Sequence, residues 1–287
     1  MALRDDLGDR MKMYETVPKT RLMRRMPVAV RIDMRSGHTF TKNFNRPFDL
    51  TFALAMDGTM RDLCKNVQGC VFGYTQSDEI TLILKDYSEF TSQSFFDYEV
   101  QKMCSILGSM ATLYFNKHWN ELISESSYYF STQGVAEVVN FWPHYRESAE
   151  RGAMFDARVW NIPREEVANL IYWRQLDAMR NSVNMCGQAF FSHKELQGKS
   201  VEDVKKMLEE RKGWSWAALD TRERWGCCCV RNYYSSPDGN LKFEGSLGEW
   251  VIDYDMPLIK GYNCEYVEQF LYANNEKTRE MIEQGIV

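Results

Sequence analysis

Two separated acidic positions are the residues best placed to do chemistry in this sequence. Asp33 lies near the end of a β-prone segment over 28–36, and Asp78 and Glu79 stand together where a second β-prone run begins. Two carboxylates that meet at one site repel each other unless a cation lies between them. Mg²⁺ prefers hard oxygen ligands, commonly carboxylates plus substrate phosphates. The pattern predicts metal-assisted phosphoryl or nucleotidyl transfer, and a solvated acidic turn at 77–79 is the alternative.

Cationic side chains surround the first of these acids. They are Arg31, Arg35, His38, Lys42 and Arg46. Arginine recognises phosphate through paired, charge-assisted hydrogen bonds. The segment is therefore a candidate phosphate-binding site, and a set of surface ion pairs is the alternative.

The order of the predicted elements brings the two acidic positions together. The elements are a strand over 28–36, a helix over 49–67 with Asp49 as its N-cap, two β runs within 70–84, a long helix over 95–123 and a strand over 154–163. This β–α–β–β–α–β order is typical of split βαβ, ferredoxin-like and palm-type domains. Such a sheet carries helices on one face and has its first and third strands as neighbours, so Asp33 and Asp78 are expected to meet.

The remaining segments complete an α+β prediction with a palm-like antiparallel sheet. Residues 5–25 are polar and helix-like, further helices are predicted over 163–187 and 200–212, the region 227–255 is β-rich, and the tail is helical. We expect a palm-like catalytic core with a basic N-terminal helix in 1–150. Residues 151–287 would hold the remainder of the core and a C-terminal α/β extension, and one continuous domain is the alternative.

Composition excludes several classes of protein. The net charge of −5 argues against a protein that coats nucleic acid generally, although residues 1–46 hold an excess of Lys and Arg. We expect a cytoplasmic protein with no membrane partner, since no apolar run has signal-peptide or membrane-span length. The eight cysteines then default to free thiols, and Cys227–Cys229 reads as a buried strand. P-loop, dinucleotide-binding and serine-hydrolase motifs are absent, and no CxxC pair predicts zinc.

Seven short motifs follow one another over residues 28–230. They are Asp33-Met34-Arg35-Ser36-Gly37-His38-Thr39-Phe40, Arg46-Pro47-Phe48-Asp49, Gln76-Ser77-Asp78-Glu79, Lys102 with Ser109, Phe155-Asp156-Ala157-Arg158, Trp173-Arg174-Gln175-Leu176-Asp177 with Asn181, and Leu196-Gln197-Gly198-Lys199-Ser200. Each is weak alone. Their order resembles that of the tRNA(His) guanylyltransferase superfamily, including its bacterial and phage guanylyltransferase-like members.

The resemblance implies a 3′–5′ nucleotidyltransferase that adds nucleotides to the 5′ end of tRNA, in tRNA(His) guanylylation or in 5′-end repair. Such enzymes activate a 5′-monophosphate with ATP, or start from a 5′-triphosphate. The 3′ hydroxyl of the incoming nucleoside triphosphate then attacks the activated 5′ phosphate. The implied substrates are ATP and GTP, the implied cofactors are two Mg²⁺ ions, and a homo-oligomer, dimer or tetramer, is implied by analogy.

The same resemblance assigns roles to individual residues. The implied catalytic residues are Asp33, Asp78 and Glu79, and the implied metal ligands are Asp33, Asp78 and the backbone carbonyl of Met34. The implied nucleotide-binding residues are Arg31, Arg35, His38, Arg46, Ser77 and Lys102. The residues implied to face nucleotide or RNA are Arg158, Arg174, Asp177 and Asn181.

Some positions depart from the family pattern and keep two alternatives open. Met34 and Ala157 replace glycines, Glu99 stands where the family tends to carry arginine, and Met179 replaces a histidine linked to tRNA(His) addition, which favours broader 5′-end repair. One alternative is a palm-domain nucleotide cyclase or signal synthase that needs no RNA. The other is a degenerate member that only binds RNA.

Overall fold

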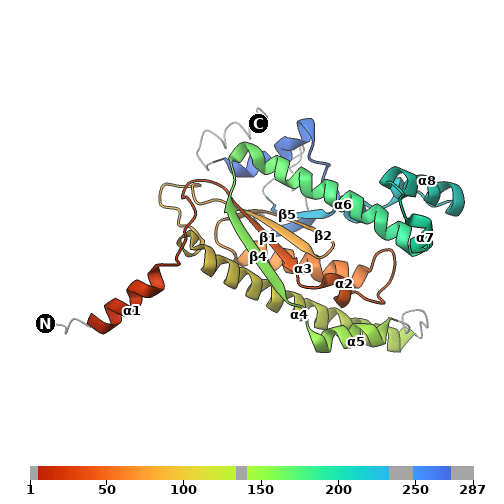
Figure 1. The fold of residues 1–287 in the computed structure, drawn as a ribbon, viewed down its shortest axis with the longest axis horizontal. Helices are drawn as coiled ribbons and strands as arrows, with labels where there is room; N and C mark the ends of the chain where they lie inside the picture. The colour runs from red at the N-terminus through yellow and green to blue at the C-terminus, as the bar shows by residue number, and fades with distance from the viewer. Residues whose placement is uncertain (1–5, 134–140, 233–247, 273–287) are drawn as a thin grey trace.

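Helices and strands are interspersed along the chain, and the strands join one sheet (Figure 1). The structure is a computed structural model and describes residues 6–133, 141–232 and 248–272. The strands are β1 (Val28–Met34), β2 (Cys70–Gln76), β3 (Glu79–Leu84), β4 (Phe155–Asn161), β5 (Cys227–Arg231) and β6 (Trp250–Asp253). The α-helices are α1 (Asp6–Thr16), α2 (Gly37–Phe40), α3 (Leu50–Asn66), α4 (Val100–Gln133), α5 (Trp142–Arg151), α6 (Val167–Phe190), α7 (His193–Leu196), α8 (Val201–Lys212), α9 (Thr221–Trp225) and α10 (Glu265–Glu268). The short 3₁₀ helices are η1 (Phe95–Tyr98), η3 (Arg164–Glu166), η4 (Trp216–Ala218), η5 (Gly261–Cys264) and η6 (Gln269–Leu271).

The sheet has six strands in the order β4-β1-β3-β2-β5-β6, and every neighbouring pair is antiparallel. The predicted β–α–β–β–α–β order over 28–162 is confirmed, and so is the pairing of the first strand with the third. β4, β5 and β6, from the second half of the chain, extend the same sheet at its two edges.

The first face of the sheet is covered by α3 and α4 (Figure 1). Alternate residues of the strands point to this side, including Val30 and Ile32 of β1, and they are fully buried. A set of aromatic rings packs between the helices: Phe40, Phe44, Phe52, Phe115, Trp119 and Tyr145. Asp49 caps α3 as predicted, because its carboxylate accepts a hydrogen bond from the Phe52 backbone N–H at 2.9 Å.

The second face is also covered, so the expectation of helices on one face only is wrong. Ala29 of β1 and Ile83 of β3 point to this side and are fully buried against Val167 and Ile171 of α6. The physical reason is that these strands alternate between two apolar sets, and each set must be removed from water. Figure 1 shows α6 crossing this side of the sheet.

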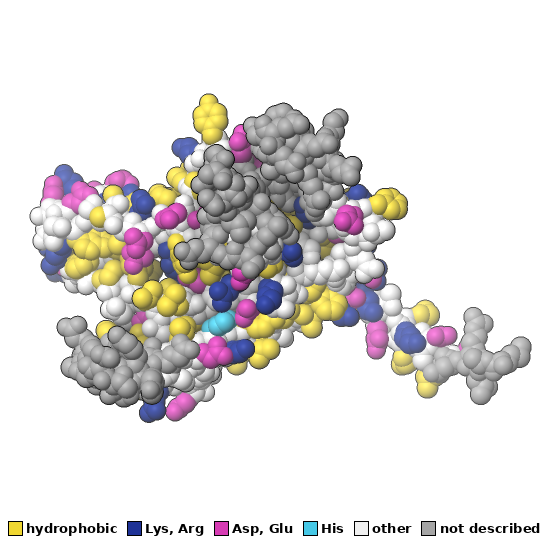
Figure 2. Space-filling view, turned by 180° about the vertical axis from the view of Figure 1, so that it is seen from behind, with side chains coloured by type: hydrophobic (Ala, Val, Ile, Leu, Met, Phe, Trp, Pro, Cys, Tyr) yellow, Lys and Arg dark blue, Asp and Glu magenta, His cyan; other side chains and the backbone are white. Residues whose placement is uncertain are grey.

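Several predicted boundaries shift. The helix expected over 5–25 ends at Thr16, and α1 stands away from the rest of the protein with no buried residue (Figures 1 and 2). The long helix expected over 95–123 begins at Val100, and the helical backbone continues to Gln133. The predicted helical tail is seen as α10 and two 3₁₀ helices, and its last part, 273–287, lies outside the described residues.

Two sequence expectations concern the environment of the protein. All eight cysteines lie in the described part of the chain and are free thiols, and Cys227–Cys229 form the buried start of β5 as predicted. Among the described helices, none combines the length and the apolar character that a bilayer crossing requires.

Candidate active site

Asp33 and Asp78 lie at the same end of the sheet. Asp33 is the register partner of Glu79 across the β1–β3 pair, and the Met34 backbone N–H donates to the Asp78 carbonyl oxygen at 3.0 Å. Ser77 and Asp78 form the turn between β2 and β3, with Ser77 at φ 49°. The expectation that topology brings these two residues together is therefore confirmed.

The carboxylate of Asp78 lies directly against the start of α2. A Cβ atom built on Gly37 would lie 2.0 Å from the Asp78 Oδ2 atom, which no real side chain allows. Glycine at this position therefore allows the Asp78 side chain to approach this closely, and any larger residue would displace the carboxylate. Ser36, the residue before it, has φ 59°, so the chain turns sharply from β1 into α2.

A third carboxylate, Asp156 of β4, belongs to the same group. Asp156 is the register partner of Asp33 on the opposite side of β1. Burial raises the pKa of Asp33, and the nearby charges of Asp78 and Asp156 raise it further, while Arg31 and Arg158 lower it. No role was predicted for Asp156, although it lies in the Phe155–Arg158 motif. The pairing register of β1 with β4, which places it opposite Asp33, is the signal that would have identified it.

These residues fit a magnesium ion. Carboxylate oxygens are the hard donors that Mg²⁺ takes, and Asp33 has the acids Asp78 and Asp156 close enough to raise its pKa beyond the effect of burial, a repulsion that a cation would relieve. In the part of the chain that the structure describes, no group of three or more His, Cys, Asp or Glu side chains has metal-binding geometry. Asp33 and Asp78 would therefore supply two ligands, and the other ligands would come from backbone, water or substrate phosphate. The Met34 carbonyl as a ligand stays a prediction.

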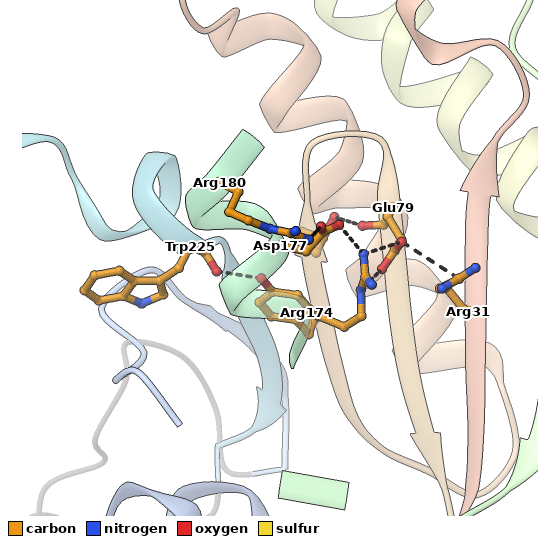
Figure 3. A network of polar contacts seen from close by, with 8 residues as sticks. Arg31, Glu79, Arg174, Asp177, Arg180 and Trp225 are labelled. Carbon is orange, nitrogen blue, oxygen red and sulfur yellow. Dashed lines mark hydrogen bonds and ion pairs between the residues drawn. The ribbon is translucent and has the colours of Figure 1, made fainter. Parts of the chain in front are cut away.

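Glu79 faces inward and is held by arginine. Arg174 donates from Nε to Glu79 Oε1 at 2.7 Å and from a terminal nitrogen to Oε2 at 3.0 Å (Figure 3). The Arg31 Nε atom lies 3.9 Å from Glu79 Oε2. Burial raises the pKa of Glu79, and both arginines oppose that shift. Since guanidinium groups occupy its oxygens, Glu79 is placed to support the site rather than to bind a metal.

Arg174 was expected to face nucleotide or RNA, but only 5% of it is exposed. Its second partner is Asp177, at 2.7 Å, and Asp177 also binds Arg180, so the four residues form one network (Figure 3). The arginine of this motif is therefore an interior residue, and the ion-pair network that it forms was not predicted. Arg158, in contrast, is exposed on β4 and lies 3.6 Å from Asp156.

A cleft of about 190 Å³ opens beside the carboxylates, between the segment 38–53 and helices α6 and α9. Four residues predicted from motifs line it: His38, Arg46, Ser77 and Asn181. Lys42, from the segment predicted to bind phosphate, also lines it. Polar lining residues without a predicted role include Gln76, Gln188, Arg222 and Glu223. Arg222 and Glu223 lie in no motif of the sequence analysis, so sequence reasoning had no signal for them.

Three predicted nucleotide-binding residues, Arg31, Arg35 and Lys102, are not among those lining the cleft. Arg35 is exposed just beyond β1, and its backbone N–H donates to the Met154 carbonyl at 2.8 Å. Lys102 is near the start of α4, where its Nζ atom lies 4.8 Å from the centre of the Phe96 ring. The neighbouring Cys104 interacts with the backbone of Val159, several residues along β4 from Asp156. The nucleotide-binding roles of Arg31, Arg35 and Lys102 stay predictions.

Two other motif residues are helix caps. Asp49 accepts from the Asn45 and Phe52 backbone N–H groups and from the Tyr145 hydroxyl. Ser200, at the end of the last motif, caps α8 by accepting from the Asp203 N–H at 3.2 Å. Both positions fix the entry of a helix, which explains them without ligand contact.

Comparison with known proteins gives a consistent result. A family model described as tRNAHis guanylyltransferase matches residues 8–163. A bacterial tRNA(His) guanylyltransferase-like protein solved in complex with ATP is similar at 36% identity, with a TM-score of 0.76, over 94% of this chain and 100% of that one. A second such bacterial structure, in complex with GTP, has 34% identity and a TM-score of 0.69 over 93% of this chain and 100% of that one. A probable tRNA(His) guanylyltransferase from Dictyostelium discoideum is 24% identical over 71% of this chain and 75% of its own.

Proposed function

This chain belongs to the tRNA(His) guanylyltransferase family and is a guanylyltransferase-like nucleotidyltransferase, and from that premise we propose that it adds nucleotides to the 5′ end of tRNA in the 3′–5′ direction. The observation that carries the proposal is the meeting of Asp33 and Asp78 at one sheet end beside a cleft with cationic lining. A palm-like arrangement of the catalytic strands is part of the proposal. The strand order and the placement of one acid on β1 and one on the β2–β3 turn support it.

The proposed substrates are ATP and GTP. Two similar bacterial structures are complexes with these nucleotides. Here, Lys42 and Arg46 give the cleft a positive charge that suits a polyphosphate, and His38 adds a hydrogen-bonding side chain. Ser77 joins the cleft to the turn that carries Asp78, so a nucleotide bound there would have its phosphates near the carboxylates.

The proposed reaction has two steps that balance without a redox partner. A 5′-monophosphate oxygen of the RNA attacks the α-phosphorus of ATP, and pyrophosphate leaves. The 3′ hydroxyl oxygen of the incoming nucleotide then attacks the RNA 5′-phosphorus, AMP leaves, and the hydroxyl proton passes to solvent. Two bound Mg²⁺ ions would supply charge neutralisation of the phosphates in this site. Asp33 and Asp78 would hold the metal, and the paired Glu79 and Arg174 would fix the β3 end that carries Asp78.

The proposed RNA contacts lie on the second face of the sheet. Arg158 is exposed at the edge strand β4, and Asn181 is exposed on α6 where it lines the cleft. Exposed arginine binds phosphate readily, and such contacts position a nucleic acid without reading its sequence. Arg174 is given a positioning role through Glu79 and Asp177, because it is buried between them.

The test is extension of a 5′-monophosphorylated tRNA that lacks its first nucleotide, with Mg²⁺, ATP and GTP, resolved at single-nucleotide length. We expect the wild-type protein to lengthen the RNA by one residue and Asp78→Ala to be slower by about 10³-fold, since a main source of electrostatic stabilisation is lost. Glu210→Ala, which removes a carboxylate from the exposed pair with Lys206, is the matched control and should react like wild type.

Two other outcomes would contradict the proposal. New nucleotide products without RNA would identify a cyclase or signal synthase. RNA binding with no product from RNA or nucleotide would identify a member that only binds RNA.

A further inference from the structure

Helix α6 carries two exposed apolar side chains on the side that does not pack against the sheet. Trp173 is 51% exposed, and Leu176, one turn further along, is 39% exposed. All eight tryptophans of the chain lie in the part that the structure describes, and Trp173 is the only one of them that is exposed. Tryptophan is usually buried in a core or enriched at an interface, so this ring points to a partner outside the chain.

The Trp173 ring is held in place by the ion-pair network beside the candidate active site. The Arg174 Cζ atom lies 4.4 Å from the centre of the ring, which is a cation–π contact. Arg174 is itself fixed by hydrogen bonds to Glu79 and Asp177 (Figure 3). A buried guanidinium therefore covers one face of the ring, and the other face is open to solvent. A ring fixed in this way loses little conformational freedom when a ligand covers its open face, which favours binding.

The contacts of Arg174 also place this ring at the end of the sheet that carries the two acids. Glu79 directly follows Asp78 and is the register partner of Asp33. Only the paired side chains of Arg174 and Glu79 lie between the ring and this strand end in the chain of contacts. A ligand on the open face of the ring would therefore lie near the carboxylates.

An exposed arginine adjoins the same network from the edge strand. Arg158 is the register partner of Arg31, whose Nε atom lies 3.9 Å from a Glu79 oxygen. The pair of Arg158 with Asp156 is 3.6 Å long and exposed on both sides, and such surface pairs contribute little, so a phosphate can replace the acid. An open ring and an exposed arginine on one network suit a ligand that combines a flat base with a phosphate.

The size of the exposed patch also favours a base over a second copy of the chain. A stable protein interface buries about 800 Å² on each partner. Trp173 and Leu176, each only partly exposed, supply a small fraction of that area. A nucleic acid base is flat, is about as large as one indole ring, and stacks on aromatic side chains.

We propose that the open face of Trp173 stacks on the base at the 5′ end of the RNA substrate, an inference that rests on the proposed function. In that function the 5′ phosphate reacts at Asp33 and Asp78, so the terminal base is the base nearest to the ring. The terminal pair of an RNA helix has one face that no neighbouring pair covers, whereas an internal pair is covered on both faces. Stacking is tolerant of sequence because every base has a π face. Trp173 therefore recognises the end of a strand and not the identity of its base.

The experiment is fluorescence anisotropy of two labelled RNAs with the full-length protein and Mg²⁺, without ATP or GTP. The open RNA is a 5′-monophosphorylated tRNA that lacks its first nucleotide. The closed RNA is the same tRNA with its two ends joined by a tetraloop, so that no terminal base is exposed. Loss of base stacking predicts that Trp173→Leu binds the open RNA about tenfold more weakly than wild type does. Its affinity for the closed RNA should stay within about twofold of wild type, and Trp173→Phe should keep most of the affinity for the open RNA, because a smaller aromatic ring still stacks.

Tryptophan fluorescence provides a second measurement. Stacking on a base quenches an indole, so the emission of wild type should fall further with the open RNA than with the closed RNA. Trp173→Phe should abolish this difference. Leu176→Ala is the matched control, because it removes an exposed apolar side chain from the same side of α6, and it should bind both RNAs like wild type.

Wild-type affinity of Trp173→Leu for the open RNA, or an equal loss on both RNAs, would overturn the inference alone while wild type still extends tRNA. A smaller assembly of Trp173→Leu in light scattering would assign the ring to a contact between copies of the chain and would also overturn it. If Trp173→Leu does not fold, an unchanged quenching difference in Trp173→Phe would overturn the inference, and loss of the difference would support it. Failure of wild type to bind either RNA would overturn the proposed function as well.

Discussion

The two faces of the sheet carry different kinds of side chains, although the same strands form both. On the α3 and α4 face, β1 contributes Val30 and Ile32 to an apolar, aromatic core. On the α6 face, the alternating residues of β1 are Ala29, Arg31 and Asp33, so the strand passes from core to charge as it nears its end. Side-chain alternation thus lets one strand build a stable interior on one side and a charged site on the other. Changes on the first face should affect folding, and changes on the second should affect chemistry.

The largest effect is expected on the first face. Trp119→Ala should lower the free energy of unfolding by about 3–5 kcal/mol, because a large buried ring leaves a cavity. Trp119 is fully buried among Phe40, Phe115 and Tyr145 and donates from Nε1 to Ser148 at 3.1 Å. Urea unfolding would measure the loss.

The exposed Leu113 on the same helix gives the control, and Leu113→Ala should change stability by about 0.5 kcal/mol or less. The comparison of faces also requires that the folded fraction of Trp119→Ala keep its nucleotidyltransferase activity. Loss of activity well beyond the unfolded fraction would show that the aromatic face shapes the site directly.

Arg174 is a residue whose replacement should change both stability and activity, so it does not follow the division between the two faces. Arg174→Met leaves the buried Glu79 without its two-bond partner, and breaking a buried ion pair costs about 3 kcal/mol or more. We expect activity to fall together with stability, because Glu79 directly follows Asp78 and is the first residue of β3. Unfolding and tRNA extension would be measured on the same samples.

The double variant Arg174→Met/Glu79→Gln separates the two effects. It should recover much of the stability, since the uncompensated charge is gone, but little of the activity. Arg180→Met, an exposed member of the same network, is the matched control with an expected change of about 0.5 kcal/mol. Full activity in the double variant would remove Glu79 from the proposed site.

Sequence reasoning predicted correctly the features that strand order or local helix-capping preference determines. The meeting of Asp33 with Asp78 followed from the order of strands, and the cap at Asp49 followed from residue type and position. Both depend on backbone geometry, which short-range patterns describe well.

The sequence was insufficient where side-chain environment decides. Nothing in the motif containing Arg174 distinguishes a buried arginine from an exposed one, because burial depends on where Glu79 lies across the sheet. The position of Lys102 was also not predictable from its motif. Helix α4 is long, and only its packing against β4 decides which part of that strand each helix residue lies beside. Asp156 and Glu223 were missed because their neighbours come from distant segments.

Gly37 gives a smaller and more selective effect. In Gly37→Ala the new Cβ would lie 2.0 Å from Asp78 Oδ2, so the carboxylate must move. The carboxylate is the end of a side chain, so stability should change little, but a displacement of this kind typically costs about 10²-fold in rate.

The contrast variant is Gly261→Ala. Gly261 has φ 61° and no heavy atom within 4 Å of an added Cβ, so the change should cost stability through backbone strain and leave activity intact. Equal tRNA extension by Gly37→Ala and wild type would show that the position of Asp78 is not critical.

The smallest effect tests whether the charged face opposes folding. Burial and two neighbouring acids raise the pKa of Asp33, so the folded protein binds its proton more tightly than the unfolded chain does. The contribution of such a group to stability is fully present below its unfolded pKa and is lost as pH rises through its folded pKa. Asp33→Asn should therefore raise the free energy of unfolding at pH 7 by less than about 1 kcal/mol, since the side chain is half-exposed and screened by solvent.

The gain in the free energy of unfolding should disappear below about pH 4, and Mg²⁺ should stabilise wild type but not the variant. Urea unfolding at both pH values, with the exposed Glu210→Gln as control, would measure it. A loss of stability at pH 7 would mean that Arg31 and Arg158 outweigh the acids, and the charged face would then help the fold as well as the chemistry.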